Sequence, residues 1–325
     1  MRMRKTVCAV LVAIFCIGAF GMTVYANDLL EAKATAHLAL FASKVADSGG
    51  FDEDFDRPPL YGRTIILDAG HGIGADNVFE GYSEGATMLR LALYITPLLE
   101  GHGANVFLTR PTGPNIHLSV RAASINLLAL ETLAAAYDMS YEGWYEMGRL
   151  QDIMRRIMYD FEYYAPTYFN FPFDSSFERV IHPDLYRIFE LQASPVIQDN
   201  FLMISLHSNA TGRPINTAIN GVDIYHMTNT MRNSANYFAN YAGVERSRLF
   251  SEILIDNLDE IGLARRGIRD GNWFIIREHN LPGALVENGF HTNPEDRALL
   301  SDDEFLLRLA AAYEDAILRY FAAIN

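Results

Sequence analysis

Cysteine is scarce in this sequence, which has 2 cysteines in 325 residues. Both of them, Cys8 and Cys16, lie near the N-terminus, so residues 27–325 have none. That part of the chain can form no disulfide and can offer no thiolate to a metal. Any metal ion held there must be bound by histidine, aspartate or glutamate.

Basic residues are also few. The chain has 26 lysine and arginine residues against 40 aspartate and glutamate residues, a formal net charge of −14. This balance argues against nucleic acid or an anionic membrane surface as a partner. Hydrophobic residues make up 50% of the 325 residues, so the chain can bury a sizeable core and should be globular.

Long apolar runs are confined to the N-terminus. Arg2, Arg4 and Lys5 precede an uncharged apolar stretch over residues 7–22, which leads to the small-residue sequence Val-Tyr-Ala. This is the pattern of a secretory signal peptide over residues 1–26. Its removal would leave 23 basic residues (26 minus 3) against 40 acidic ones, a net charge of −17.

The alternative is that this segment stays attached as an uncleaved membrane anchor. We favour cleavage because the apolar stretch is short for a membrane span and Val-Tyr-Ala suits signal peptidase. No other stretch is expected to cross a membrane, so the cleaved protein should have no stable membrane span. The sequence thus predicts an extracytoplasmic protein, located in the periplasm, in the cell wall or in the medium.

The rest of the chain divides into a short leader and one α/β domain. Residues 27–60 are expected to form an amphipathic helix and an acidic linker, followed by the domain over residues 61–325. Its first elements should be a strand, a helix capped by Ser83, and a second strand, which together favour a mainly parallel twisted sheet flanked by helices. Further strands are expected over 201–206, 221–226, 273–276 and 284–286, and further helices over 246–261 and 303–321.

Residues 127–198 form a segment of different character, rich in aromatic residues. We expect a helix over 127–164 with a break near Ser140, an aromatic loop over 166–177, and a helix over 178–191. This pattern predicts a helical insertion in the α/β domain. Two interpretations stay open: its aromatic residues form a small helical core on the main domain, or the insertion is a lid or regulatory arm with aromatic faces for sugar stacking.

Three of the predicted strands run into residues that can bind a metal or exchange protons, namely His71, His207 and Glu287. Open α/β sheets place their sites at the carboxyl edge of the strands, so these residues should converge. Two imidazoles and one carboxylate are a common catalytic zinc set, and a second carboxylate can act as general acid and base. Glu84 begins the predicted helix, where the helix dipole favours an ionised ligand.

These features together resemble the zinc-dependent N-acetylmuramoyl-L-alanine amidases of the Amidase_3 type. The resemblance covers about 61–126 and 199–321 and would make 61–325 the amidase catalytic domain. It implies Zn²⁺ ligands at His71, Glu84 and His207, and a catalytic glutamate at Glu287. The motifs, in order, are 65–72, Glu84 with Leu89, Thr109 with Arg110, Leu118 with Arg121 and Asn126, 204–210, 221–225, and a C-terminal block of 281–282, 285–290 and 293–295.

The implied reaction is hydrolysis of the amide bond between the lactyl group of muramic acid and L-alanine of the peptidoglycan stem peptide. The implied partners are peptidoglycan and a regulatory or activator protein, with no nucleic acid. The chain departs from the family pattern between residues 73 and 83, which leaves Glu80 as a rival to Glu84 for the second ligand position. Alternative functions are another peptidoglycan zinc peptidase and a catalytically silent wall-binding module.

Several other residues are weaker candidates. Arg121 and Asn126 are expected to shape the fold or to buttress the site, and Asn209 to support the His207 loop. Arg266 and Arg269 could meet the acidic stem peptide or form a solvated charged turn. His226, His279 and His291 are expected to be structural or surface residues, with His291 the closest to Glu287 in sequence.

Overall fold

The computed structural model describes residues 57–169, 180–230 and 237–325. The predicted signal peptide and most of the 27–60 leader lie outside these residues. The domain is built on a six-stranded sheet with the order β4-β1-β5-β8-β6-β7. Its strands are β4 Asn105–Leu108, β1 Thr64–Ala69, β5 Phe201–Asn209, β8 Gly283–Phe290, β6 Val222–His226 and β7 Arg265–Asp270.

The first four strands in this order run parallel to one another. β6 pairs antiparallel with β8, and β7 runs parallel to β6. The predicted fold class, a mainly parallel sheet flanked by helices, is therefore confirmed. β1 is buried along its whole length, as its apolar sequence requires of a strand covered on both faces.

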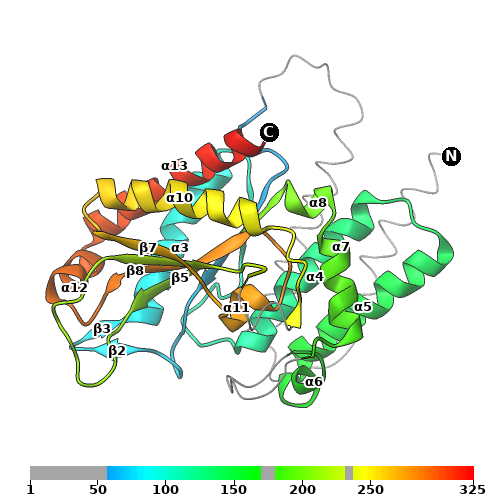
Figure 1. Cartoon of the computed structure of the whole chain (residues 1–325), viewed down its shortest axis with the longest axis horizontal. Coiled ribbons are helices and arrows are strands. Elements are labelled where there is room, and N and C mark those ends of the chain that lie inside the picture. The colour runs from blue at the N-terminus through cyan, green and yellow to red at the C-terminus, as the bar shows by residue number, and fades with distance from the viewer. Residues whose placement is uncertain (1–56, 170–179, 231–236) are drawn as a thin grey trace.

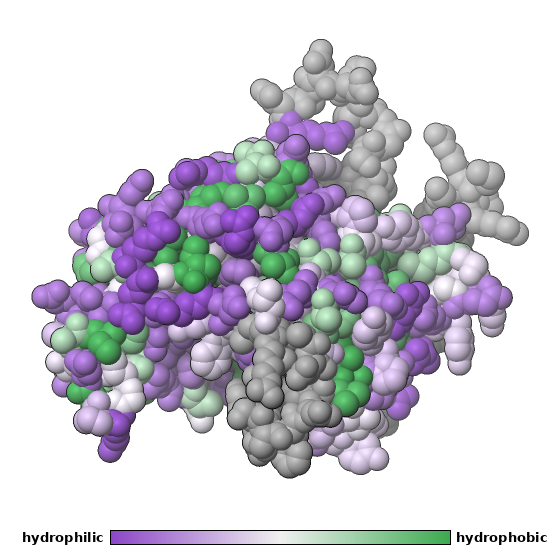
Figure 2. Space-filling model, in the orientation of Figure 1, coloured by the Kyte–Doolittle hydropathy of each residue, from purple (hydrophilic) through white to green (hydrophobic). Residues whose placement is uncertain are grey.

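Helices cover both faces of the sheet (Figure 1). Ile65 and Leu67 of β1 pack into one core cluster with α3 Glu84–Gly101, α10 Val244–Glu260 and α13 Asp303–Ile324. Ile66, which points to the opposite face, packs into a second cluster with α4 Leu118–Ala136 and the helices that follow it. In the view of Figure 2 the outer surface is mostly hydrophilic, with small separate hydrophobic areas, because these helices bury their apolar sides.

The predicted insertion contributes most of this second layer. Its helices are α5 Tyr141–Tyr159, α6 Phe161–Tyr168, α7 Pro183–Gln192 and α8 Pro195–Gln198. Their buried side chains belong to the same cluster as the sheet residues Phe201, Met203 and Leu285. Buried hydrogen bonds also join the insertion to the rest of the domain. Gln192 donates to Asn126 at 2.7 Å and accepts from the backbone N–H of Asn280 at 2.7 Å.

The helix boundaries in this region differ from the predicted ones. The break near Ser140 is confirmed, because Ser140 caps α5 by accepting from the Gly143 N–H. The helix before the break already begins at Leu118, and α7 begins at Pro183, several residues after the predicted start. Most of the predicted aromatic loop, residues 170–177, lies outside the described residues.

The predicted strand over 273–276 is wrong, because Phe274–Arg277 is a short helix, α11. Phe274, Ile275 and Ile276 are all buried, so this short apolar run shows no periodicity that could separate strand from helix. The sequence prediction also missed β7, an edge strand in which four of six residues are charged. Charge is common on edge strands, but it removes the alternating pattern that predicts a strand.

One helix of the described residues, α4, is long and apolar enough to cross a membrane by length and composition. Of its apolar window, 78% is buried inside the structure, which is what a core helix requires. The prediction of no span after the signal overlooked this helix, whose packing against the sheet explains its composition.

Candidate metal centre

His71 follows the end of β1 at a sharp turn. The φ angle of His71 is 56° and that of Gly72 is 136°. Both residues therefore have the positive φ that a tight turn after the strand requires. The His71 Nδ1 lies 3.0 Å from the carbonyl oxygen of Ala75. Because a carbonyl only accepts, Nδ1 must carry the proton, which leaves a lone pair on Nε2.

Glu84 is the first residue of α3, and its side chain is 1% exposed. Its Oε1 accepts a hydrogen bond from the Ser208 N–H at 3.0 Å and lies 3.0 Å from His207 Nδ1. Its Oε2 accepts from Asn77 Nδ2 at 3.1 Å. Burial opposes ionisation of Glu84, but the hydrogen bond and charge of His207 and the charge of His71 outweigh it and lower its pKa.

His207 lies near the carboxyl end of β5, with its ring against the backbone of Gly70. A Cβ on Gly70 would be 2.4 Å from His207 Cε1, far inside van der Waals contact. The glycine before His71 is therefore required by the position of the second imidazole. Burial works to lower the pKa of His207, yet the carboxylate of Glu84 raises it above its ordinary value.

The structure brings the three side chains together. One ligand atom from each of His71, Glu84 and His207 lies within 4.8 Å of the other two. The His71 Nε2 lone pair faces Glu84 Oε2 at 3.3 Å, an unfavourable pairing of two acceptors unless a proton or a cation lies between them. Two imidazoles and one carboxylate in this arrangement fit a divalent metal such as zinc, and leave room for further ligands.

Glu287 lies beside this cluster on β8, directly across from His207 in the strand register. Its Oε2 is buried, with no hydrogen-bond partner among the described residues. Burial raises the pKa of Glu287 to about 8, against the opposing effect of His207 and with smaller contributions from the Glu84 and Asp223 carboxylates. A carboxyl group of this kind can hold or release a proton near neutral pH.

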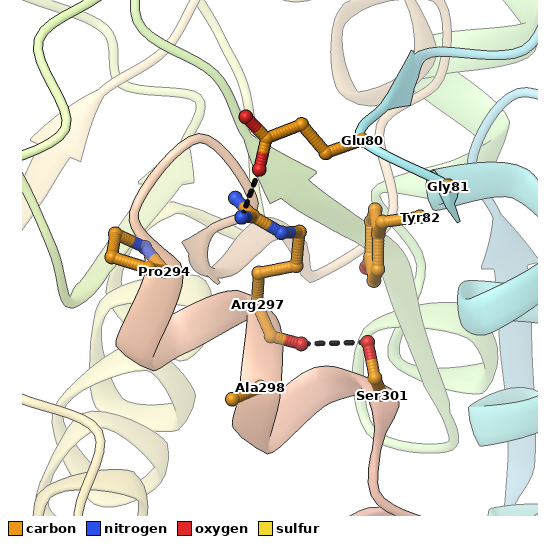
Figure 3. A pocket seen from close by; sticks show the side chains of 7 residues that line it. All are labelled: Glu80, Gly81, Tyr82, Pro294, Arg297, Ala298 and Ser301. Atoms are coloured by element: carbon orange, nitrogen blue, oxygen red, sulfur yellow. Dashed lines mark hydrogen bonds and ion pairs between the residues drawn. The ribbon is translucent and has the colours of Figure 1, made fainter.

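Glu80 points away from the cluster. It lies in the turn between β2 Val78–Phe79 and β3 Tyr82–Ser83, and its carboxylate pairs with Arg297 on α12 Pro294–Ser301. Figure 3 shows this ion pair beside the Tyr82 ring, at the mouth of a pocket between the turn and α12. The geometry therefore favours Glu84 over Glu80 as the second ligand.

Two buried arginines hold the backbone of the His71 turn. Arg121 donates to the carbonyls of Ala69 and His71 and pairs with Asp68 at 3.1 Å. Arg110 donates to the carbonyl of Gly70 at 3.1 Å. The buttress role predicted for Arg121 thus has a direct structural basis, whereas the roles of Asp68 and Arg110 were missed. The feature of the sequence that could have identified these two residues is a charged side chain inside an apolar strand or shortly after it.

The remaining candidates take structural positions. Arg266 and Arg269 both pair with the buried Asp223, at 2.9 and 2.8 Å. Asn126 donates to the carbonyl of Glu278 at 2.8 Å, away from the cluster. His226, His279 and His291 are buried, and His291 Nδ1 lies 3.0 Å from the Ser208 hydroxyl. Asn209 accepts from the Ala210 N–H at 2.8 Å, so it shapes the turn after β5.

Comparison with known proteins points to one enzyme family. Residues 191–319 match the family model of N-acetylmuramoyl-L-alanine amidase, Amidase_3. LytC of Bacillus subtilis, an N-acetylmuramoyl-L-alanine amidase, is 25% identical over 120 residues, which are 37% of this chain and 21% of LytC. An uncharacterized cell wall amidase of Bacillus anthracis is 28% identical over 121 residues, again 37% of this chain and 21% of the relative.

The crystal structure of the N-acetylmuramyl-L-alanine amidase Ami1 from Mycobacterium smegmatis has the same fold. It superposes with a TM-score of 0.50 and 14% identity, over 81% of this chain and 99% of Ami1. The chain spans only about a fifth of the two amidase relatives that it matches in sequence. The matches support an amidase of the peptidoglycan family, and the matched segment contains His207 and Glu287 but begins after His71 and Glu84.

Proposed function

We propose that this protein is an exported, zinc-dependent N-acetylmuramoyl-L-alanine amidase. In this proposal it hydrolyses the amide bond between the lactyl group of muramic acid and the L-alanine of a stem peptide. The observation that carries the proposal is the convergence of His71, Glu84 and His207 within 4.8 Å, beside Glu287 on β8, which lies in the segment that matches the amidase family model.

The three converging side chains would hold the metal. Zinc bound there would supply a Lewis acid for the scissile carbonyl and would lower the pKa of a water ligand. A hydrogen bond to the Ala75 carbonyl orients His71, and hydrogen bonds from Asn77 and Ser208 orient Glu84. The His71 Nε2 and the Glu84 carboxylate therefore face the same space. Orientation of ligands by such hydrogen bonds is a general feature of metal sites.

Glu287 would move the proton. In its ionised form it accepts a proton from the attacking water, and in its protonated form it delivers that proton to the nitrogen of the leaving amine. The unpartnered Oε2 can accept the proton, and burial, which raises the pKa of Glu287, favours the protonated form that would deliver it. The amide then breaks into a lactyl carboxylate and a free L-alanine amine.

The proposed place of action is outside the cytoplasm. The N-terminal pattern of residues 1–26 and the sequence similarity to a cell wall amidase of Bacillus anthracis support this. The substrate would be peptidoglycan, and a regulatory or activator protein is a proposed second partner.

The test is digestion of purified peptidoglycan by the zinc-loaded protein, with mass spectrometry of the products. An amidase releases intact stem peptides that begin with a free L-alanine amine. Release of shortened peptides would instead identify a peptidase. The absence of any product from protein that holds stoichiometric zinc would leave only a wall-binding role.

A further inference from the structure

The Ser208 hydroxyl lies in a buried hydrogen-bonded cluster behind the Glu84 carboxylate. Its oxygen is 2.9 Å from the Tyr82 hydroxyl and 3.0 Å from His291 Nδ1. The Tyr82 and His291 rings stack with their centroids 5.3 Å apart and their planes inclined by 19°. All three side chains are buried, so the hydroxyl has two fixed partners and little freedom to rotate.

Each member of this cluster belongs to a segment that carries a residue of the metal centre. Tyr82 lies on β3, two residues before Glu84, and Ser208 directly follows His207. His291 directly follows β8, which carries Glu287, and its carbonyl accepts a hydrogen bond from Arg297 at 2.9 Å. The cluster therefore connects three of the four pieces of chain from which the site is assembled, all but the turn that carries His71.

The backbone at Ser208 is not held by a regular strand ladder. The pairing of β5 with β8 shifts register between His207 and Asn209, so Ser208 stands at an irregularity of the sheet. Such an irregularity re-aims the residues around it. The N–H of Ser208 is nevertheless directed at Glu84 Oε1, at 3.0 Å. The side-chain bonds to Tyr82 and His291 supply the constraint that the ladder lacks.

We propose that Ser208 is a positioning residue for Glu84, held in place by Tyr82 and His291. Its hydroxyl fixes the orientation of the peptide group whose N–H holds the carboxylate, and thereby aims the Glu84 oxygens at the two histidines. This inference rests on the proposed metal site. It assigns to Tyr82 and His291 a role that acts through Ser208, without contact with substrate.

The experiment is a zinc competition titration against a chromophoric chelator, using the full chain after removal of endogenous metal. The variants are Ser208→Ala, Tyr82→Phe and the double variant. Ser251→Ala is the matched control, because its buried hydroxyl donates to the Ser247 carbonyl at 2.7 Å within α10, a helix that carries none of the four residues of the proposed site.

Loss of an orienting partner outside the ligand set weakens metal affinity by roughly 10–100-fold, and Ser208→Ala is expected at the lower end, about tenfold. Tyr82→Phe should weaken zinc binding less, because His291 still holds the serine. The double variant should bind as Ser208→Ala does, because Tyr82 acts only through Ser208. Ser251→Ala should bind zinc as the wild type does.

Wild-type zinc affinity in both Ser208→Ala and Tyr82→Phe would overturn the positioning role. Equal losses in Ser208→Ala and Ser251→Ala would also overturn it, because they would reflect general destabilisation. If the wild-type protein itself bound no zinc, the metal assignment would fall and the positioning role with it.

Discussion

At the scale of single residues, the site combines two side chains with opposite electrostatic settings. Glu84 is surrounded by imidazoles and N–H donors that lower its pKa, whereas the pKa of half-buried Glu287 is raised and its buried Oε2 has no hydrogen-bond partner among the described residues. The first setting suits the metal ligand proposed at Glu84, and the second suits the proton carrier proposed at Glu287. Such a difference in pKa between two nearby carboxyl groups is the usual basis for assigning distinct roles to them.

Replacement of Glu287 should separate metal binding from turnover. Glu287→Gln keeps the size of the side chain but cannot exchange a proton, so turnover should fall by at least about a hundredfold, the lower range for loss of a general acid–base group. Zinc content, measured by elemental analysis, should stay at the wild-type level, because Glu287 is not in the ligand cluster. Near-normal turnover in Glu287→Gln would remove it from the mechanism.

The raised pKa of Glu287 also predicts the pH dependence of stability in metal-free protein. Its pKa is about 8 in the folded state against an ordinary 4.5, so the folded protein binds the proton more tightly than the unfolded chain does. Stability from this group is complete below pH 4.5 and is lost as the pH rises through about 8.

Urea unfolding of the chelated protein across this pH range measures the effect. Glu287→Gln should lose less stability than the wild type between pH 4.5 and 8, because it has no proton to release. Identical pH profiles for the two proteins would contradict the raised pKa.

At the scale of elements, the position of His207 depends on the strand beside it. Gly70 directly follows β1, and its missing side chain leaves the space that the imidazole fills. Gly70→Ala should therefore displace His207 and weaken zinc binding by roughly 10–100-fold, as for other losses of ligand orientation. The backbone of Gly70 does not have positive φ, so alanine can be accommodated without unfolding.

The control for this substitution is Gly148→Ala. Gly148 lies inside α5, and a Cβ there would meet nothing within 4 Å. This variant should bind zinc normally and gain up to about 1 kcal/mol of stability from the better helix former. Unchanged zinc affinity in Gly70→Ala, measured by the same competition titration, would show that the contact with His207 is unimportant.

The sequence was sufficient to predict most of these elements. Apolar strands that run into His71, His207 and Glu287 predicted that the three would meet at one sheet edge, and they do. Ser83 was correctly predicted as the cap of α3. The choice of Glu84 over Glu80 needed the structure, because only the path of the β2–β3 turn shows that Glu80 faces Arg297.

Other features could not be predicted because they depend on contacts between distant segments. The pairing of Arg121 with Asp68 and the Tyr82–Ser208–His291 cluster join residues 53 or more positions apart. β7 was missed because its charged sequence lacks the alternation of a buried strand. The segment over 273–276 was assigned to the wrong element because its three buried apolar residues, Phe274, Ile275 and Ile276, are too short a run to show a period.

At the scale of the whole molecule, the helical insertion covers one face of the sheet. Its helices share a core with β1, β5 and β8 and are joined to the domain through Gln192, Asn126 and Asn280. Deletion of residues 127–198 would expose that face, so the shortened chain should not fold. A cooperative thermal transition followed by circular dichroism, retained in the deletion variant, would contradict this prediction.

The exposed aromatic residues of α5 provide the complementary test. Tyr141 and Tyr145 are 82% and 70% exposed, so they contribute little to the core. Replacing both with serine should change the stability by no more than about 0.5 kcal/mol per residue. A loss of peptidoglycan binding in this variant, measured by sedimentation with purified cell walls, would support sugar stacking by the insertion. Unchanged binding would leave only its role in the core.

The proposed function, a zinc-dependent amidase of peptidoglycan, is a property of the whole protein. Its most direct test is product analysis after digestion of purified peptidoglycan, with His207→Ala and Glu287→Gln alongside the wild type. The account predicts intact stem peptides with a free L-alanine amine from the wild-type protein, and none from either variant, with zinc lost only from His207→Ala. Intact stem peptides from protein freed of metal, or equal release by all three proteins, would contradict it.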